Sequence, residues 1–537
     1  MSPERASAGG AHGNLRRAIL ATGAAVVLVA LVLTGKGRAT AACPQHPRAF
    51  PAGAASVPGR PNLILIVTDD QRWDTLWAMP KLERLLAGHG VTFANSFVTT
   101  SLCCPSRTSI LTGEYSRHTG VRGDSPPVGG APAFHDGSTL ATWLHGAGYT
   151  TGMIGKYLND YPMLGRAYIP PGWDEWDAID EDRPALLYYD YSLNENGAIV
   201  RCGSEPEDYS TTVLGERAVQ FVRTAPAPFF LYLAPIAPHL PARPAPGDRA
   251  PAPPVPVREP PSIREQNLSD KPWAQTLRFQ NTSPARMARV RTHVLATLQG
   301  VDRMVAHVVS ALQARGSLSN TVIAFTSDNG MLMGEHRLVG KVWPYEESIR
   351  VPLVFRTPWT HAARIDRHLA LNIDLASTFS QLAGVRPGLP QDGRSLVPLL
   401  HGRRVPWRTA FTEEYLAGGL LRHGGPMPYE AIRTERYLYV EYLNGWRELY
   451  DLHKDPYELD NLAGKPRAAA LQVSLSKRLR RLLLRGGPGY AKVWVDTGPL
   501  GPGGWWQART TSMGTLSRVG QSAAVRKLAS AIAAAAR

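Results

Sequence analysis

Four runs of apolar residues, each about the length of a strand, lie along the first two thirds of the chain. They cover residues 62–68, 149–154, 228–234 and 320–327. Because the apolar residues are continuous rather than alternating with polar ones, each run fits a strand buried on both faces of a sheet. The sequence therefore predicts a central, mostly parallel sheet.

Patterns of helical period separate these runs. Between residues 292 and 315, apolar side chains recur at every third or fourth position, and Gly316 ends the pattern, as in an amphipathic core helix. Residues 374–384 predict a helix with a glycine stop, and residues 106–112 predict the opening turns of another, with Pro105 near its first position. Strands that alternate with helices are typical of an α/β fold, so we expect helices on both faces of the sheet.

Beyond residue 400 the pattern changes to short strands. The runs 437–442 and 448–452 flank Asn444-Gly445, a signal for a hairpin, and residues 468–484 predict a helix that packs on it. We therefore expect a smaller C-terminal antiparallel sheet subdomain.

These patterns divide the chain into four parts. We expect an export segment at 1–42, an α/β domain at 60–400, a C-terminal α+β subdomain at 405–485, and a basic, Gly/Ala-rich tail at 486–537 that is partly disordered.

The first 42 residues have the pattern of an export signal that is cleaved. Arg16 and Arg17 precede an apolar run at 18–33, and residues 39–41 supply the small side chains of a cleavage site. The paired arginines also fit a twin-arginine signal. An apolar run of about 16 residues is short for a membrane span. We therefore expect a secreted, extracellular protein, with membrane anchoring as the minor alternative.

Net charge adds little to this picture. The 537 residues include 59 Lys and Arg against 44 Asp and Glu, a formal charge of +15. A basic surface would steer acidic substrates, although the abundance of arginine throughout the chain explains the charge equally well. The sequence contains no dense Lys/Arg run with interleaved aromatic residues, so it does not indicate nucleic-acid binding.

The chain has four cysteines, of which Cys103 and Cys104 are adjacent. Outside the cell, Cys43 and Cys202 could form a disulfide, but the sequence leaves this pairing open.

Polar residues follow the end of each apolar run. They are Asp69-Asp70, Lys156, His239 and Asp328-Asn329. In open α/β sheets, ligands bind at the carboxyl edge of the strands, so we expect these residues to meet in one cleft. Adjacent carboxylates after a buried strand are costly to desolvate without a cation, and hard oxygen ligands suit calcium or magnesium.

One stretch, TTSLCCPSRTSILTG at 99–113, resembles a known signature. Its pattern Cys103-x-Pro105-Ser106-Arg107-xxx-Leu-Thr-Gly113 matches that of the type I sulfatases. In that family the first cysteine is oxidised to formylglycine, whose hydrate is the nucleophile. The matching position is Cys103, and Cys104 is expected to be a packed neighbour.

The resemblance implies an alkaline-phosphatase-like fold and a formylglycine-dependent sulfatase activity. Within the family, GKYLNDY at 155–161 and APIAPHLP at 234–241 are similar to N-acetylglucosamine-6-sulfatases and extracellular heparan sulfatases. The implied metal is Ca²⁺, with Mg²⁺ as the alternative, and its implied ligands are Asp69, Asp70, Cys103, Asp328 and Asn329. The implied catalytic residues are Cys103, Arg107, Lys156, His239 and Lys341. The implied substrate contacts come from Lys156, His239, His336 and Lys341.

The expected reaction is the hydrolysis of sulfate esters, with a sulfated sugar or an aryl sulfate as substrate. The diol at position 103 would attack sulfur, and His239 or Lys341 would protonate the leaving alcohol. A formylglycine-generating enzyme is the expected partner during maturation. Two alternatives stay open: an arylsulfatase or phosphonate/phosphate ester hydrolase of the same superfamily, and an unmodified, inactive glycan-binding protein.

Overall fold

The structure is a computed structural model. It describes residues 43, 50, 59–181, 183, 187–253, 259–274, 283–417 and 426–484. The predicted export segment and tail lie outside the described residues. Among the helices of the described ranges, none has the length and apolar character needed to cross a membrane.

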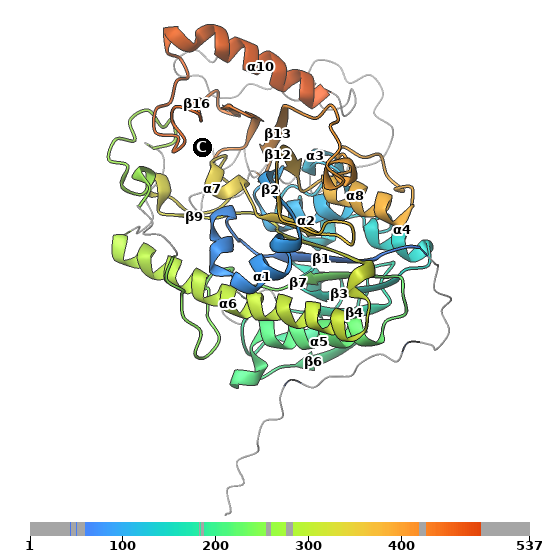
Figure 1. Ribbon diagram of the computed structural model, residues 1–537. Helices are drawn as coiled ribbons and strands as arrows, with labels where there is room; N and C mark the ends of the chain where they lie inside the picture. The colour runs from blue at the N-terminus through green and yellow to red at the C-terminus, as the bar shows by residue number, and fades with distance from the viewer. Residues whose placement is uncertain are drawn as a thin grey trace, which may run out of the picture. The chain divides into compact units, whose positions relative to one another are not determined.

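A ten-stranded sheet lies at the centre of the described chain (Figure 1). Its strand order is β12-β2-β11-β8-β1-β7-β3-β4-β5-β6. The strands are β1 (Asn62–Thr68), β2 (Gly90–Phe97), β3 (Thr150–Gly155), β4 (Glu175–Ile179), β5 (Ser192–Glu195), β6 (Ala198–Arg201), β7 (Phe229–Ala234), β8 (Thr321–Ser327), β11 (Leu353–Arg356) and β12 (Arg364–Leu371). The five strands from β8 to β4 run parallel, which confirms the predicted mostly parallel sheet. Antiparallel pairs form at β11, β5 and β6.

The register of the parallel strands brings their carboxyl ends together. Thr68 of β1 lies beside Ser327 of β8, and Gly155 of β3 lies beside Ala234 of β7. Since β1 also pairs with β7, the residues that follow these four strands emerge at one edge of the sheet.

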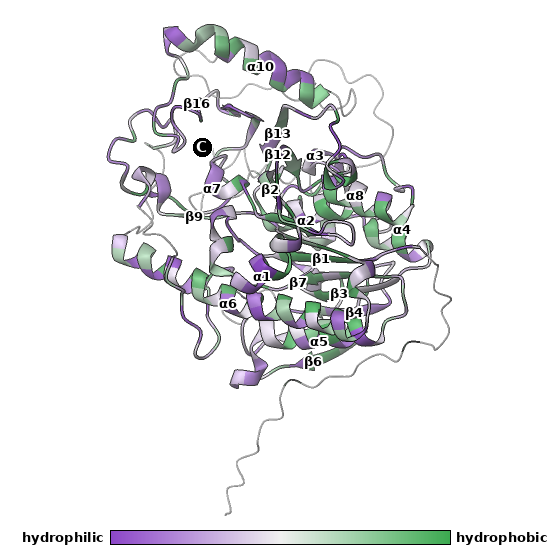
Figure 2. Cartoon of the chain, viewed as in Figure 1, coloured by the Kyte–Doolittle hydropathy of each residue, from purple (hydrophilic) through white to green (hydrophobic). Residues whose placement is uncertain are grey.

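Helices cover both faces of the sheet, as the alternating pattern predicts. One face carries α1 (Pro80–Leu85), α5 (Ser210–Thr224) and α6 (Pro284–Ala314), and the other carries α2 (Cys103–Thr112), α4 (Leu140–Gly146) and α8 (Asp374–Ala383). Strand β1 is buried along its whole length. Its Ile64 and Ile66 pack in the hydrophobic core on the α1, α5 and α6 face, and Leu63, Leu65 and Val67 pack in the core on the α2, α4 and α8 face. Figure 2 accordingly colours the central strands as hydrophobic.

Two helices begin earlier than the sequence pattern predicts. Helix α6 starts at Pro284 instead of residue 292, because Ser283 caps it and its first two turns bury only Met287, which leaves no apolar period to detect. Helix α2 starts at Cys103, with Pro105 as its third residue. Proline is tolerated there because the first N–H groups of a helix have no partner within it.

A four-stranded antiparallel sheet follows the α/β part. It consists of β13 (Ala410–Tyr415), β14 (Tyr429–Thr434), β15 (Tyr437–Tyr442) and β16 (Arg447–Asp451), in that order. Helix α10 (Ala469–Leu483) packs on it through Leu475 and Leu479. The predicted hairpin and packing helix are therefore present, and Gly445 in the turn has a positive φ of 92°.

Shorter elements connect these parts. They are the ribbon of β9 (Leu332–Met333) and β10 (Val339–Gly340), and the short helices α3 (Ser116–Thr119), α7 (Glu346–Ile349) and α9 (Val397–Leu400). The 3-10 helices are η1 (Trp73–Ala78), η2 (Ala87–His89), η3 (Ala131–Ala133), η4 (Tyr161–Leu164), η6 (Pro206–Asp208), η7 (Pro261–Arg264), η8 (Leu318–Asn320), η9 (Glu335–Arg337) and η11 (Pro466–Ala468).

Cys43 and Cys202 form a disulfide, with their Cα atoms 4.4 Å apart. The backbone N–H of Cys43 also donates to Asp208 Oδ1 at 2.7 Å. The pairing that the sequence left open is thus made, and it fixes residue 43 to the segment that follows β6.

Candidate active site

The turn after β1 places two carboxylates at the carboxyl edge of the sheet. Asp69 and Asp70 are both buried, and Asp70 has a left-handed backbone with φ of 67°. The N–H of Asp70 donates to Asp328 Oδ1 at 3.1 Å, and the N–H of Gln71 donates to Ser327 Oγ at 2.9 Å. The segment after β8 therefore holds this strained turn in place.

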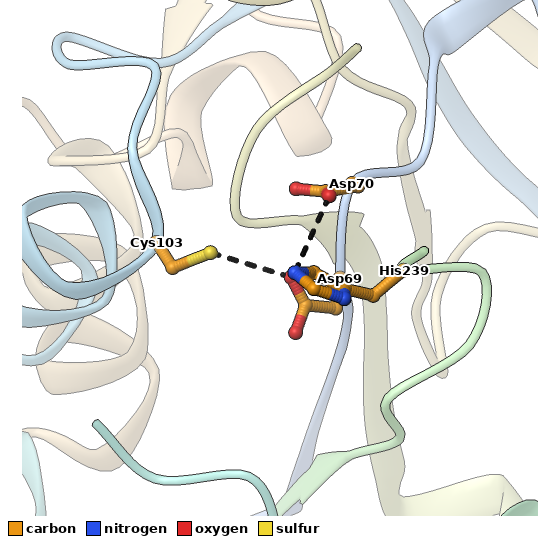
Figure 3. A group of neighbouring side chains, drawn as sticks. All are labelled: Asp69, Asp70, Cys103 and His239. Atoms are coloured by element: carbon orange, nitrogen blue, oxygen red, sulfur yellow. Dashed lines mark hydrogen bonds and ion pairs between the residues drawn. The ribbon is translucent and has the colours of Figure 1, made fainter. Parts of the chain in front are cut away.

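Cys103, the first residue of α2, faces these carboxylates (Figure 3). Its thiol donates to Asp69 Oδ1 at 3.4 Å, and Lys341 Nζ lies 2.6 Å from its Sγ. Burial, together with the charge of Asp69, raises the pKa of this thiol well above its ordinary value. Cys104 is fully buried, as expected for a packed neighbour.

Lys156 and Arg107 approach the second carboxylate oxygen of Asp69, Oδ2. Lys156 Nζ is 2.5 Å from Asp69 Oδ2. The guanidinium of Arg107 is fully buried, donating from Nε to Asp328 Oδ2 at 2.8 Å and from Nη1 to the carbonyl of Lys156 at 2.7 Å. Arg107 thus connects the segments that follow β8 and β3.

Lys341 and His239 approach Asp70. Lys341 Nζ lies 2.5 Å from Asp70 Oδ1. His239 Nε2 lies 3.7 Å from Asp70 Oδ2 (Figure 3). His239 Nδ1 is 2.6 Å from the carbonyl oxygen of Leu240. Because a carbonyl only accepts, Nδ1 carries the hydrogen, and Nε2 is the nitrogen that faces the cluster.

Opposite charges control the ionisation of this cluster. Burial alone would raise the pKa of Asp69, but the cations Lys156, His239, Arg107 and Lys341 hold it far below its usual range. Burial raises the pKa of Asp328, and the neighbouring charge of Asp69 adds to the rise. In Lys341, burial alone would lower the pKa of the amine, but the combined charges of Asp70 and the other acidic groups around it raise the pKa. The cluster is therefore strongly polarised, with charges of both signs in contact.

The residues present fit a hard divalent cation. Asn329 donates from Nδ2 to Asp70 Oδ1 at 2.6 Å, whereas its Oδ1 is buried without a hydrogen-bond partner. Ligand atoms of Asp69, Asp70, Cys103 and His239 also lie within 4.8 Å of one another. An unpartnered amide oxygen among carboxylates is the kind of donor set that Ca²⁺ and Mg²⁺ prefer.

His336 is not in contact with this cluster in the described structure. Its side chain is fully buried, and Nδ1 lies 2.6 Å from Glu265 Oε2. The ring also packs on Tyr345, with centroids 4.3 Å apart. The structure thus brings together all the sequence-predicted site residues except His336.

Asp124 belongs to the site and carries no sequence signal. Its Oδ1 accepts from the N–H of Cys104 at 2.9 Å, at the start of α2. Burial raises the pKa of this carboxyl, opposed by the nearby charge of Lys341. Asp124 follows a glycine in an irregular segment, with no strand end or motif to mark it.

Comparisons with known proteins agree with this geometry. A family model described as Sulfatase matches residues 61–385, and one described as N-sulphoglucosamine sulphohydrolase, C-terminal, matches residues 334–484. The Drosophila melanogaster protein named extracellular sulfatase SULF-1 homolog is 36% identical over 374 residues, which are 66% of this chain and 33% of that protein. The chain thus spans about a third of the length of that relative.

Two further similarities cover most of both chains. The N-acetylglucosamine-6-sulfatase of Capra hircus is 31% identical over 463 residues, 77% of this chain and 81% of that protein. A structure of a protein in complex with its substrate D-glucosamine-2-N,6-O-disulfate superposes with a TM-score of 0.65 and 26% identity, over 79% of this chain and 97% of that chain. The chain therefore belongs to the sulfatase family of sulfuric ester hydrolases.

Proposed function

We propose that this protein hydrolyses sulfate esters of sugars, using a formylglycine made from Cys103 and a divalent cation. The observation that carries the proposal is the contact of Cys103 Sγ with both Asp69 and Lys341 at the carboxyl edge of the sheet. A cysteine whose thiol pKa is raised by burial is a poor nucleophile. Formylglycine at this position would instead supply a hydrated aldehyde, whose hydroxyl attacks sulfur and whose second hydroxyl allows sulfate to leave.

The cation would be held by oxygen atoms of Asp69, Asp70, Asp328 and Asn329. When bound, it supplies positive charge for the sulfate oxygens and for the ionised nucleophile. Among these ligands, Asp69 stays ionised because of the cations around it. The unpartnered Oδ1 of Asn329 would gain a partner.

The remaining residues bind the sulfate and move protons. Lys156 and Lys341 each place an ammonium group beside the carboxylates, within reach of a tetrahedral anion that binds there. Arg107 orients Asp328 and the backbone of Lys156. The leaving alcohol takes its proton from His239 or Lys341, and Nε2 is the His239 atom that faces the site.

Mass spectrometry of the peptide that contains position 103 tests the nucleophile. The secreted native protein is expected to carry an aldehyde there, with oxygen in place of sulfur. Cys103→Ala is expected to abolish sulfate release from a sulfated glucosamine while circular dichroism stays unchanged. Cys104→Ala is the matched control, because it removes a buried thiol one residue away and keeps the nucleophile. A fully retained thiol with sulfatase activity would refute the assignment.

For the substrate, we propose an N-acetylglucosamine-6-sulfate type of sugar. The name of the Capra hircus relative and the stretch at 155–161 support this choice. A panel of sulfated mono- and oligosaccharides, aryl sulfates and matched phosphonate monoesters tests it. The highest kcat/KM is expected for a 6-sulfated glucosamine, and a higher value for an aryl sulfate or phosphonate would reassign the substrate.

We also propose that the protein is secreted and meets a formylglycine-generating enzyme beforehand. The Cys43–Cys202 disulfide supports secretion, since such bonds persist in oxidising compartments. Fractionation of cells that express the full chain should place it in the medium without residues 1–42. Recovery in the membrane fraction with an intact N-terminus would favour the anchored alternative.

A further inference from the structure

A second group of metal-ligating side chains lies apart from the Cys103 cluster. A ring nitrogen of His336 and one carboxylate oxygen each of Glu347 and Glu458 lie within 4.8 Å of one another. His336 belongs to η9 and Glu347 to α7, whereas Glu458 lies in the segment after β16. Three parts of the chain that are distant in sequence thus bring nitrogen and oxygen donors together.

Each of these side chains has a buried nitrogen or oxygen atom that could bind a metal and has no hydrogen-bond partner. The atoms are His336 Nε2, Glu347 Oε2 and Glu458 Oε1. The three residues are exposed by only 0%, 6% and 1%. A buried polar group without a partner is unfavourable, and a charged one is more so. Because all three residues of one cluster keep such an atom, the cluster points to a bound ligand.

The hydrogen bond of His336 prepares its free nitrogen for a metal. Nδ1 lies 2.6 Å from Glu265 Oε2, and a carboxylate accepts, so Nδ1 carries the hydrogen. Nε2 is then left as the nitrogen with a free lone pair. Histidines that bind metals usually donate their other N–H to a carboxylate in this way, which fixes the tautomer and the orientation of the ring.

The charges around the cluster favour a dication. The neighbouring cations are already paired, as Arg72–Glu335, Arg433–Glu346 and Lys271–Glu265. Lys271 Nζ donates to the backbone carbonyl of Glu458 at 2.6 Å. The charges of Arg72 and Arg433 act on Glu347 and Glu458, but within the described part of the chain neither carboxylate forms an ion pair with them. Burial and the nearby Glu335 raise the pKa of Glu347 to about 8. A dication would neutralise both carboxylates, which otherwise have to bind protons to stay buried.

We propose that His336, Glu347 and Glu458 form a second, structural metal site that takes a transition-metal dication, with Zn²⁺ as the ion that fits best. Zinc accepts one imidazole nitrogen and carboxylate oxygens at about 2.0–2.2 Å. Two donors of one ion then lie at most about 4.4 Å apart, so donors within 4.8 Å of one another need only a small side-chain movement. Calcium is disfavoured because it takes oxygen ligands.

Such an ion would fix the segment that carries Lys341. His336 and Glu347 lie on either side of Lys341, and Glu458 comes from the C-terminal part of the chain. The site would therefore tie both ends of the Lys341 segment to the region after β16. It would also act independently of any modification at Cys103, so its test does not depend on sulfatase activity.

The test measures metal content of the full-length protein. Purified protein is freed of metal with a chelator, titrated with Zn²⁺, desalted and analysed by elemental mass spectrometry. Wild type is expected to retain one more equivalent of zinc than Glu347→Gln or Glu458→Gln, and X-ray absorption should show an imidazole nitrogen in the zinc shell. Glu265→Gln is expected to weaken zinc binding about 10- to 100-fold, because it replaces the carboxylate that orients His336 and also pairs with Lys271.

Glu430→Gln is the matched control, since Glu430 is another buried glutamate with a raised pKa but lies outside the cluster. Its zinc content should equal that of wild type. The isosteric Glu→Gln variants also keep the test decisive if His336→Ala fails to fold. Equal zinc content in wild type, Glu347→Gln and Glu458→Gln would overturn the proposal. Thermal stabilisation of these two variants without any zinc in wild type would likewise overturn it, in favour of protonated carboxyl groups.

Discussion

At the scale of single residues, Arg107 makes two hydrogen bonds at once that a lysine at this position could not make together. Its fully buried guanidinium contacts Asp328 through Nε and the carbonyl of Lys156 through Nη1. A lysine keeps the charge but lacks the planar fork that makes both contacts at once. The side chain of Arg107 therefore fixes the position of Asp328, a proposed metal ligand, relative to Lys156, which is proposed to bind the sulfate.

Arg107→Lys is accordingly expected to lower kcat/KM by about 100-fold, as small misplacements of catalytic groups do. Steady-state kinetics on a sulfated glucosamine measure the change. Arg303→Lys is the control, because Arg303 makes a similar two-point contact with Asp248 while 40% exposed, and neither residue is a proposed catalytic or metal-binding group. An Arg107→Lys enzyme with the kcat/KM of wild type would show that the fork is dispensable.

Residue-level reasoning from the sequence succeeded where a strand end or a motif marked the residue. Asp69, Lys156, His239 and Asp328 follow apolar runs, and the structure brings them together. Asp124 was missed because it lies in an irregular segment. Which atoms contact each other also depends on rotamers and turn geometry, which no local pattern encodes.

At the scale of elements, the C-terminal sheet places like charges opposite each other. Glu414, Glu430 and Glu441 are cross-strand partners on β13, β14 and β15. Arg117 pairs with Glu414 at 2.7 Å, and Arg447 approaches Glu441 at 3.7 Å. Burial raises the pKa of Glu430 to about 7, and the neighbouring charge of Glu414 adds to the rise. The folded sheet thus holds a proton on Glu430 more tightly than the unfolded chain does.

This shift predicts a loss of stability as the pH rises. Below about pH 4, Glu430 is protonated in both states. Between about pH 4 and 7 the unfolded chain loses its proton first, so the free energy of unfolding falls, by on the order of 3 kcal/mol, and then levels off. Glu430→Gln lacks this loss and is expected to melt above wild type at pH 8 but at the same temperature at pH 4. An equal difference in melting temperature between Glu430→Gln and wild type at pH 4 and at pH 8 would contradict the raised pKa of Glu430.

The predicted boundaries of strands agree with the structure where an apolar run ends at polar residues. The prediction for β1 matches the structure at both ends, and β8 begins one residue later than predicted. The start of α6 was placed eight residues late, because its first turns are rich in arginine. A cap and good helix formers extend that helix without leaving an apolar period.

At the scale of the whole molecule, the disulfide links two residues that are far apart in the sequence. Cys43 and Cys202 are 159 residues apart in sequence. Cross-linking a loop of that length removes much of the entropy of the unfolded chain. Cys202→Ser is expected to lower the free energy of unfolding by about 2–5 kcal/mol.

Urea denaturation of the oxidised protein measures this loss, and wild type treated with a reductant is the matched comparison. Both should unfold at a similar, lower urea concentration than oxidised wild type. An unchanged midpoint in Cys202→Ser would mean that the bridge contributes nothing to stability.

The overall architecture was only partly predictable. Continuous apolar runs indicate buried parallel strands, and the five strands from β8 to β4 agree. The edge formed by β12, β2 and β11 was not anticipated, because strand order depends on contacts between distant segments. Shorter strands such as β11, with four residues, also give too little pattern to detect.

The burial of Cys103 has a consequence for the order of events during biosynthesis. Only 1% of this residue is exposed, and Lys341, which arrives from far along the chain, lies against its sulfur. Under the proposed modification, an oxidising enzyme that binds the residues around Cys103 would have to act while they are still extended, before Lys341 has docked against the sulfur. Oxidation and folding are thus competitors in time, and the fraction of active molecules in a preparation should rise when translation or folding is slowed.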